Sequence, residues 1–216
     1  MATHKISTPA TIMISGPSGC GKSTLVEQLI TRASEAFDVT PDRVVFCYSR
    51  DQSLYADIAR KSTIPIEFVQ GLPADLKPAP NSLVIIDDLQ GEGPTISDWF
   101  TKNSHHFNCS VMYLVQNLFL NTPHHRTCNL NTHVLCVFKN PRDKVQVMCL
   151  ARQISPENPK FILSAFSQAT ERPHGYLVFN LKQATPDHLR LRDSFFDEAT
   201  FFVDKKNMQT FDLVIQ

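Results

Sequence analysis

The sequence predicts an α/β fold in which a mainly parallel central sheet is flanked by helices. Short apolar runs such as Val44 to Tyr48 alternate with segments whose apolar residues recur at helical spacing, a pattern typical of a parallel sheet with helices on both faces. A glycine-rich turn connects one apolar run, Ile12 to Ser15, to a helical pattern. Another apolar run, Leu83 to Ile86, ends in the carboxylates Asp87 and Asp88.

The length of the chain suits a single domain. A chain of 216 residues is long enough for one α/β domain with a full core and short for two. We expect a polar N-terminal tail at residues 1–10, the α/β domain at residues 11–195, and a C-terminal tail at residues 196–216 without an assignable pattern.

Charge and cysteine usage narrow the class of protein. The chain has 21 Lys and Arg against 21 Asp and Glu, which argues against a general nucleic-acid coat but leaves room for a local basic ring or channel. The six cysteines form no Cys-x-x-Cys pair, and the N-terminus has no signal-peptide pattern, so we expect reduced thiols and an intracellular protein. The apolar runs are too short to span a bilayer, and no membrane partner is expected.

Elements of the first half are predicted from hydrophobic period and from turn residues. Apolar residues at helical spacing predict one helix from about 23 to 36. The apolar run at 44–48 predicts a buried strand, followed by a helix at about 52–61, a short extended segment at 66–69 and a proline-rich loop. The run at 83–88 predicts a strand ending in two carboxylates. Gly91, Gly93 and Pro94 predict a loop, and Ile96, Trp99 and Phe100 mark one face of a helix ending near 106.

The second half continues the same alternation. Strands are predicted at 110–115 and 134–138, separated by a polar loop at 122–127 and a short helix at 128–131. Two proline-initiated helices follow, at about 141–153 and 156–169, because proline is favoured in the first turn of a helix. Two closing strands are predicted at 175–181 and 189–195.

The glycine-rich turn matches the P-loop, or Walker A, pattern Gly-x4-Gly-Lys-Ser, from Gly16 to Ser23. Phosphates need several backbone N–H donors in one small concavity, and the following helix adds its N-terminal dipole. Lys22 is expected to reach the β and γ phosphates of ATP, and the Ser23 hydroxyl to ligate Mg²⁺. The predicted nucleotide-binding residues are Gly16, Pro17, Ser18, Gly19, Cys20, Gly21, Lys22, Ser23 and Thr24.

The second half of such a site is a carboxylate at the end of a buried strand. Asp87 follows four apolar residues as a Walker B aspartate does and is expected to hold Mg²⁺ through water. Asp88 comes next, where a general base or water-orienting carboxylate lies in hydrolysing P-loop ATPases; a helix-capping or loop role is the alternative. We expect the strand at 44–48 to lie between the Walker A and Walker B strands, which indicates an additional-strand ATPase rather than a simple nucleotide kinase.

Two further polar residues are candidates for catalysis. Gln116 follows the strand at 110–115 and is expected to sense the γ phosphate and orient water, the alternative being an amide that caps the loop at Asn117. Arg126 could reach the γ phosphate bound by a neighbouring subunit, because a guanidinium stabilises the charge that spreads over a transferring phosphoryl group. A surface or DNA-backbone arginine is an equal alternative for Arg126, and Arg142 and Arg152 are weaker candidates for the same role.

Histidines and cysteines crowd the segment 124–136, which raises the question of zinc. No paired Cys-x-x-Cys anchors the set, and His105 and His106 suit the last turn of a helix. Core or loop positions are therefore the favoured interpretation, and structural zinc is the alternative.

The ordered set of motifs resembles a known family. It comprises the P-loop, the run from Leu83 to Asp88, and the segments His105-His106-Phe107-Asn108-Cys109-Ser110-Val111, Leu114-Val115-Gln116-Asn117-Leu118-Phe119, Arg126, Asn131-Thr132-His133, Phe138-Lys139-Asn140-Pro141-Arg142-Asp143 and Leu150-Ala151-Arg152-Gln153. Over residues 10–195 this set resembles the genome-packaging ATPases of the FtsK–HerA superfamily, in the poxvirus-like branch of adintoviruses, adomaviruses and Polinton elements. Members often carry Asp-Glu at Walker B, whereas this chain departs from that pattern with the shorter Asp88 at the second position.

The resemblance implies a P-loop NTPase of the additional-strand type that forms a homo-oligomeric ring and drives double-stranded DNA into a preformed capsid. It implies Lys22 and Ser23 in Walker A, Asp87 and Asp88 in Walker B, Gln116 as sensor and Arg126 as the arginine finger acting in trans. ATP and Mg²⁺ are the implied cofactors, and capsid vertex proteins the implied partners. The implied location is the host cell, in the nucleus or at a cytoplasmic assembly site, or the virion.

Two other functions share parts of this pattern. An ATP-dependent helicase or replication motor has the same core but carries an origin-binding or other DNA-binding domain, for which 216 residues leave no room. A nucleoside or nucleotide kinase has a similar length and a P-loop, but needs an arginine-rich lid and an acceptor pocket. DNA dependence of ATP hydrolysis separates the motor from the kinase.

Overall fold

The computed structural model describes residues 5–50 and 53–204. Strands occupy β1 (Thr11–Ser15), β2 (Arg43–Tyr48), β3 (Ile66–Gln70), β4 (Ser82–Asp87), β5 (Ser110–Val115), β6 (Val134–Phe138), β7 (Tyr176–Asn180), β8 (Leu191–Arg192) and β9 (Phe201–Phe202). Helices occupy α1 (Lys22–Thr31), α2 (Ala33–Ala36), α3 (Ser53–Lys61), α4 (Gly93–Asp98), α5 (Ser104–His106), α6 (Pro123–Leu130), α7 (Val145–Ile154) and α8 (Pro159–Ala169). Two short 3-10 helices, η1 (Gln90–Glu92) and η3 (Asp187–Leu189), and a π-helix, η2 (Trp99–Asn103), complete the helical elements of the described residues.

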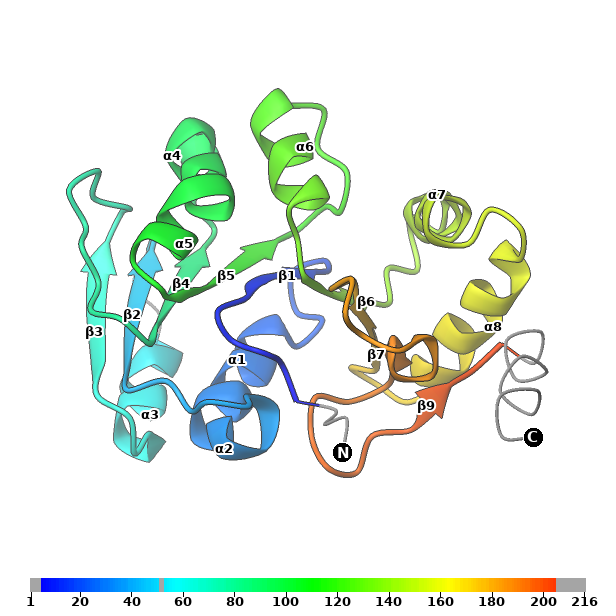
Figure 1. The fold of residues 1–216 in the computed structure, drawn as a ribbon, viewed down its shortest axis with the longest axis horizontal. Helices are drawn as coiled ribbons and strands as arrows, with labels where there is room; N and C mark the ends of the chain where they lie inside the picture. Colours follow the sequence, from blue (N-terminus) through cyan, green and yellow to red (C-terminus); the bar gives the residue numbers. More distant parts are fainter. Residues whose placement is uncertain (1–4, 51–52, 205–216) are drawn as a thin grey trace.

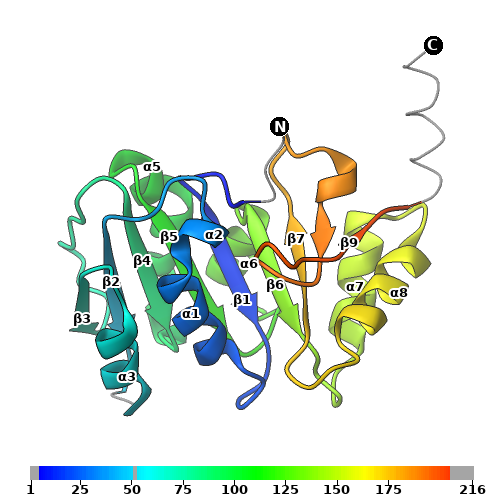
Figure 2. The same cartoon turned by 90° about the horizontal axis from the view of Figure 1, so that it is seen from below.

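All described strands belong to one twisted sheet with the order β3-β2-β4-β5-β1-β6-β7-β8-β9. The strands from β3 to β6 are parallel, and β7, β8 and β9 extend the sheet with antiparallel pairs. Helices α1, α2 and α3 cover one face, and α4 to α8 cover the other (Figures 1 and 2). The predicted α/β class with a mainly parallel sheet is confirmed.

Alternation along the parallel strands divides the core in two. On β1, Ile12 and Ile14 pack with Leu25 and Leu29 of α1, whereas Met13 packs on the opposite face with the cluster that holds Trp99. Successive side chains of a strand point to opposite faces, and a strand covered on both faces is apolar throughout. The buried runs in the sequence therefore belong to the strands at the centre of the sheet.

The strand between the Walker A and Walker B strands is not the predicted one. β2 lies on the far side of β4 and pairs with β3 and β4, whereas β5 pairs with both β1 and β4. The additional-strand arrangement is present, but β5 supplies the inserted strand. Order along the chain misled the prediction because a parallel sheet is free to place a later strand between two earlier ones.

Several helix boundaries also differ from those predicted. The helix expected over 23–36 breaks at Arg32, whose carbonyl accepts hydrogen bonds from both Glu35 and Ala36. The loop expected at Gly91 to Pro94 is helical, with Pro94 in the first turn of α4. The helices expected to begin at Pro141 and Pro156 begin at Val145 and Pro159.

The loop expected at 122–127 is the first part of α6. The Thr122 hydroxyl caps this helix by accepting a hydrogen bond of 3.2 Å from the backbone N–H of His125, and Pro123 occupies the first turn. A threonine followed by proline is a helix-start signal that the polar composition of the segment obscured. Arg126 therefore lies on a helix and not in a loop.

The sheet and core extend beyond the expected domain limits. Ile6 and Ala10 are buried, and Ile6 bridges to Phe37, so the described part of the predicted N-terminal tail packs on the domain. At the other end β8 is shorter than the strand predicted at 189–195, Phe196 is buried and β9 pairs with β8. Residues 205–216, the remainder of the predicted C-terminal tail, lie outside the described residues. Within the described ranges, each helix is too short or too polar to cross a membrane.

Candidate nucleotide-binding site

The glycine-rich turn between β1 and α1 has a shape that depends on its glycines. Gly19 and Gly21 have φ angles of +76° and +110°, a region that side chains disfavour. A Cβ atom at Gly16 would lie 2.6 Å from Cys20 Sγ and 2.7 Å from Phe138 Cβ. The tight curl of the turn therefore requires positions without side chains. α1 begins directly after the turn, at Lys22.

The Lys22 side chain lies across this turn. Its ammonium donates hydrogen bonds of 2.5 Å to the carbonyl of Gly16 and 3.1 Å to the carbonyl of Pro17. The positive charge is thus held over the concavity formed by the turn. An anion that enters there meets a lysine, the first N–H groups of α1 and the positive end of the helix dipole.

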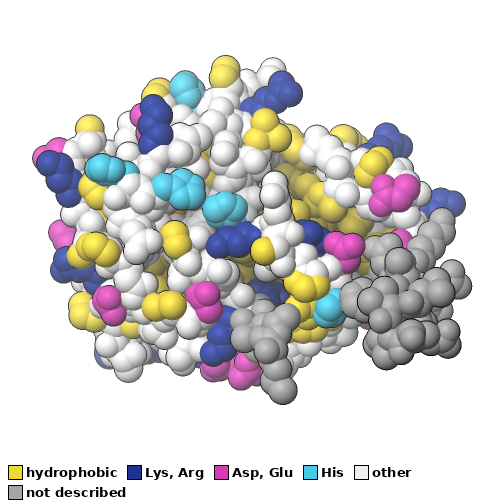
Figure 3. Space-filling view, in the orientation of Figure 1, with side chains coloured by type: hydrophobic (Ala, Val, Ile, Leu, Met, Phe, Trp, Pro, Cys, Tyr) yellow, Lys and Arg dark blue, Asp and Glu magenta, His cyan; other side chains and the backbone are white. Residues whose placement is uncertain are grey.

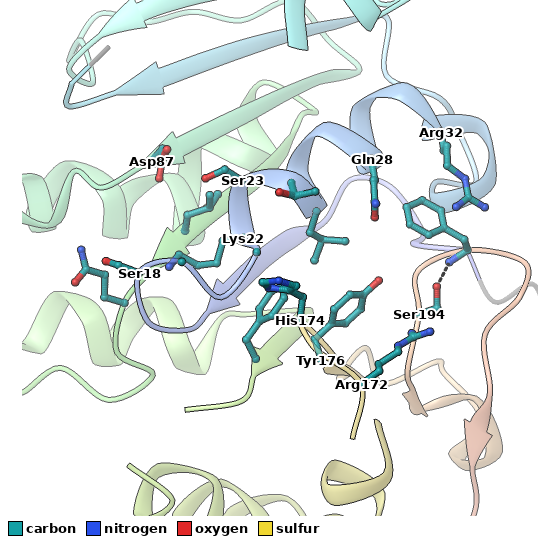
Figure 4. A pocket seen from close by; sticks show the side chains of 18 of the residues that line it. Ser18, Lys22, Ser23, Gln28, Arg32, Asp87, Arg172, His174, Tyr176 and Ser194 are labelled. Carbon is teal, nitrogen blue, oxygen red and sulfur yellow. Dashed lines mark hydrogen bonds between the residues drawn. The ribbon is translucent and has the colours of Figure 1, made fainter. Parts of the chain in front are cut away.

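A cleft of about 800 Å³ opens above the turn (Figure 4). It runs along the edge of the sheet at which the parallel strands have their carboxyl ends, where α/β proteins bind ligands. Six of the nine predicted nucleotide-binding residues line it, and Gly16, Pro17 and Cys20 form the turn behind them. The six are Ser18, Gly19, Gly21, Lys22, Ser23 and Thr24.

One end of the cleft holds the predicted magnesium ligands. Ser23, in the first turn of α1, and Asp87, the last residue of β4, face each other there (Figure 4). Asp87 is 7% exposed. Burial raises the pKa of its carboxyl and Asp88 adds to this, whereas a hydrogen bond from Tyr55 and the charge of Lys22 act in the opposite sense. Hydroxyl and carboxylate oxygens are hard donors, so the pair fits Mg²⁺, which is commonly held by one or two carboxylates together with substrate phosphates.

Asp88 and Gln116 lie side by side at the same end. β4 and β5 are neighbouring parallel strands, so the residues that follow them meet at one edge. The Gln116 side-chain amide donates a hydrogen bond of 3.4 Å to Asp88 Oδ1, and both residues line the cleft. Asp88 has a φ angle of +54°, a left-handed conformation that aspartate tolerates better than most residues.

The other end of the cleft consists of residues that the sequence analysis missed. β7 is antiparallel, so it begins at this edge and brings His174 and Tyr176 beside the P-loop. His174 Nδ1 lies 3.0 Å from the carbonyl of Cys20. The remaining lining residues at this end include Gln28, Arg32, Phe138, Arg172, Ser194, Phe196 and Glu198. The strand at 175–181 was predicted, but its antiparallel direction has no signal in the sequence.

An arginine bound to two carboxylates closes this end. Arg32 forms salt bridges of 2.6 Å with Glu35 and 3.0 Å with Glu198, and its guanidinium lies 3.9 Å from the centroid of the Phe196 ring. These contacts tie α1 to the segment after β8. They involve Phe196 and Glu198, which belong to the predicted C-terminal tail.

Arg126 does not lie in this cleft. It is exposed on the second turn of α6, whereas the arginines that line the cleft are Arg32 and Arg172. Arg126 is therefore not among the residues placed to contact a nucleotide in the cleft of its own chain, and its role in trans stays a prediction.

The histidines of the described residues are dispersed over the fold. Figure 3 shows several histidine side chains on the face covered by α4 to α6, with Lys and Arg interspersed among Asp and Glu. Within residues 5–50 and 53–204, no group of three or more His, Cys, Asp or Glu side chains could hold a metal ion. His125 is instead buried, with Nε2–H donating a 2.8 Å hydrogen bond to the carbonyl of Leu118, and His133 Nδ1 accepts a hydrogen bond from the backbone of Thr11.

Comparison with solved structures identifies the fold. The genome packaging NTPase B204 from Sulfolobus turreted icosahedral virus 2, solved in complex with ATP-γS, superposes with a TM-score of 0.50 at 13% identity over 85% of this chain and 96% of that chain. This chain has the fold of a P-loop NTPase of the additional-strand type. ATPases 2 and 3 of EssC from Geobacillus thermodenitrificans match at a TM-score of 0.47 and 12% identity, over 66% of this chain and 34% of that one, and add nothing to this assignment.

Comparison of the sequence with protein families gives a match over a shorter part of the chain. A family model for RNA helicases matches residues 12–66, the segment that contains the P-loop, α1 and β2. No curated protein matches the chain. The similarity to solved structures therefore establishes the fold, and the residues of the cleft are the main evidence for a specific function.

Proposed function

We propose that this protein is an ATPase that translocates double-stranded DNA and packages a viral or virus-like genome into a preformed capsid. The observation that supports ATP hydrolysis is that one cleft is lined by Lys22, Ser23, Asp87, Asp88 and Gln116. These residues lie in one helix, α1, and at the ends of two strands, β4 and β5, and each has a side chain suited to one step of phosphoanhydride hydrolysis. The likeness to a packaging NTPase solved with ATP-γS supports the choice of ATP.

In this proposal the nucleotide lies along the cleft with its γ phosphate at the end that holds Asp88 and Gln116. Asp88 and Gln116 lie at one end, so the γ phosphate belongs there, over the Lys22 ammonium and next to Ser23 and Asp87. The sugar and base then extend toward the opposite end, between α1 and the start of β7. Tyr176 and Phe196 line that end and supply the apolar surface that a purine base requires.

Each residue has a separate task in the proposed reaction. Lys22 and the turn hold the phosphates, and Ser23 and Asp87 hold Mg²⁺, which neutralises the charge that develops on the phosphoryl oxygens. Asp88 accepts a proton from the attacking water, and the Gln116 amide orients that water. The hydrogen bond between these two side chains keeps them together at the γ-phosphate end.

The coupling to DNA is the less direct part of the proposal. Its support is the fold shared with B204 and the ordered motifs that resemble the poxvirus-like packaging ATPases. In this proposal the chains form a homo-oligomeric ring, Arg126 of one subunit enters the cleft of the next, and capsid vertex proteins anchor the ring. It would act in the host cell where capsids assemble. Net charge near zero is compatible with it, because only the residues that line a channel contact phosphates.

Steady-state ATP hydrolysis with and without long double-stranded DNA, at several protein concentrations, tests this proposal. A motor predicts stimulation by DNA and a steep dependence on protein concentration. Turnover that ignores DNA but rises with an added nucleoside or nucleotide would favour a kinase. DNA-stimulated turnover accompanied by strand separation would favour a helicase.

A further inference from the structure

A buried tyrosine from a different element contacts the proposed Walker B aspartate. Tyr55 lies in the first turn of α3 and is 4% exposed. Its hydroxyl donates a hydrogen bond of 3.1 Å to Oδ2 of Asp87, at the end of β4. The two residues are 32 positions apart in the chain, so the contact depends on how α3 packs on the sheet.

The Tyr55 ring is held in place by aromatic neighbours. Its centroid lies 4.9 Å from that of Phe46, 5.2 Å from that of Tyr48 and 5.6 Å from that of Phe68, the last in a stacked arrangement. These three residues belong to β2 and β3. Because aromatic rings packed on several sides have little freedom to move, the sheet itself fixes the position of the Tyr55 hydroxyl.

A fixed hydroxyl at this distance restricts the rotation of the carboxylate. The terminal torsion of an aspartate side chain is broad, so Asp87 has little intrinsic preference for one orientation. With Oδ2 occupied by Tyr55, Oδ1 remains for the side of the cleft on which Ser23 lies. Hydrogen-bond partners of this kind orient metal ligands, and removing one typically costs about 10 to 100-fold in metal affinity or activity.

We propose that Tyr55 is a positioning residue that orients Asp87 for Mg²⁺ bound with the nucleotide. This inference rests on the proposed ATPase function and deepens it. Tyr55 is not among the residues that line the cleft, and in this proposal it acts through the Asp87 carboxylate. Its contribution is therefore to the metal dependence of nucleotide binding, and not to the contacts of the P-loop with the phosphates.

A magnesium titration of nucleotide binding tests this role without relying on turnover. The binding of a fluorescent ATP analogue is measured for the wild-type protein and for Tyr55→Phe, first in EDTA and then with increasing Mg²⁺. We expect the affinity in EDTA to be unchanged in Tyr55→Phe, and the Mg²⁺ concentration that gives half of the metal-dependent change to rise about tenfold. An unchanged midpoint in Tyr55→Phe, with normal magnesium dependence in the wild-type protein, would overturn the inference alone.

Two further variants separate positioning from packing. Tyr48→Phe removes a hydroxyl from the same aromatic cluster, and we expect it to behave as the wild-type protein; an equal rise in its midpoint would assign the effect to the cluster and overturn the inference. Asp87→Asn is expected to raise the midpoint, and Tyr55→Phe should add nothing in that background, whereas a full additional effect would contradict action through Asp87. A wild-type protein that binds no analogue would overturn the proposed function itself.

Discussion

The side-chain amide of Gln116 donates a hydrogen bond of 3.4 Å to the carboxylate of Asp88, joining the ends of two neighbouring parallel strands. The contact pairs the predicted sensor with the predicted base. Asp88 also has a left-handed backbone, with φ of +54°, and such conformations are commonly found at functional sites. We therefore expect the two residues to act as one unit in hydrolysis.

Loss of either member of this pair should affect hydrolysis and spare binding. We expect Asp88→Asn to lower kcat for ATP by about 100-fold or more, because a general base contributes on that scale. Gln116→Ala should lower kcat in the same sense, and ATP affinity should change little in both variants. Asn117→Ala, which alters the adjacent exposed amide, serves as the control. Steady-state kinetics with separate nucleotide-binding measurements check this, and an unchanged kcat in Asp88→Asn would remove the assigned base.

The glycines of the turn should differ in their tolerance of a methyl group. Gly16→Ala places a Cβ within 2.7 Å of Phe138 and Cys20, so we expect a loss of unfolding free energy and of nucleotide binding. Gly19→Ala meets no atom within 4 Å but has φ of +76°, and should cost about 1 kcal/mol through backbone strain. Gly91→Ala, with neither restriction, is the control. Urea unfolding measures all three, and equal stabilities would contradict the described turn.

The protein should lose stability as the pH falls below about 6.5. Burial lowers the pKa of His125 and of His133 in the folded chain. The unfolded chain then binds more protons than the folded chain, so the free energy of unfolding falls as the pH drops through the unfolded pKa and levels off below the folded one. We expect His125→Asn to reduce the difference in unfolding free energy between pH 7 and pH 5, and His106→Asn, at an exposed position, to leave it unchanged. If the difference in unfolding free energy between pH 7 and pH 5 were as large in His125→Asn as in the wild-type protein, His125 would not contribute to the pH dependence of stability.

Arg126 should act only between subunits. We expect Arg126→Ala to bind ATP normally and to lose turnover by about 1,000-fold, the scale of an arginine finger. Mixing it with Asp88→Asn should restore part of the activity, because some interfaces then combine an intact Arg126 with an intact Asp88. Size-exclusion chromatography verifies that mixed oligomers form. Mixed oligomers that remain inactive would count against the trans role.

The sequence predicted the centre of this molecule better than its periphery. The strands that carry the P-loop, Asp87 and Gln116 are buried on both faces, so each appears in the sequence as an apolar run with a polar end. The structure places those polar ends in one cleft. The order of the strands in the sheet could not be predicted from the sequence, because β5 lies between β1 and β4 and pairs with residues that are distant in the chain. Tyr55 escaped notice for the same reason, since its helical position matched an ordinary core residue.

The far end of the cleft shows a second limit of sequence reasoning. Tyr176, Phe196 and Glu198 line it only because β7 runs antiparallel and the chain returns past β8 to α1. Phe196 and Glu198 belong to no recognised motif, and the run Phe195-Phe196-Asp197-Glu198 gives no indication of contact with a nucleotide. The P-loop was recognised because its backbone geometry requires particular residues at fixed spacing, whereas contact with a base can be made by many residue types.

The most direct test of the account compares ATP hydrolysis by the wild-type protein and by Lys22→Ala in a single-turnover assay with Mg²⁺. Circular dichroism and thermal unfolding of both proteins establish that the variant is folded. The account predicts hydrolysis by the wild-type protein that disappears in Lys22→Ala, because the ammonium above the turn is expected to hold the β and γ phosphates. Undiminished hydrolysis by a folded Lys22→Ala protein would contradict the assignment of this cleft as the ATPase site.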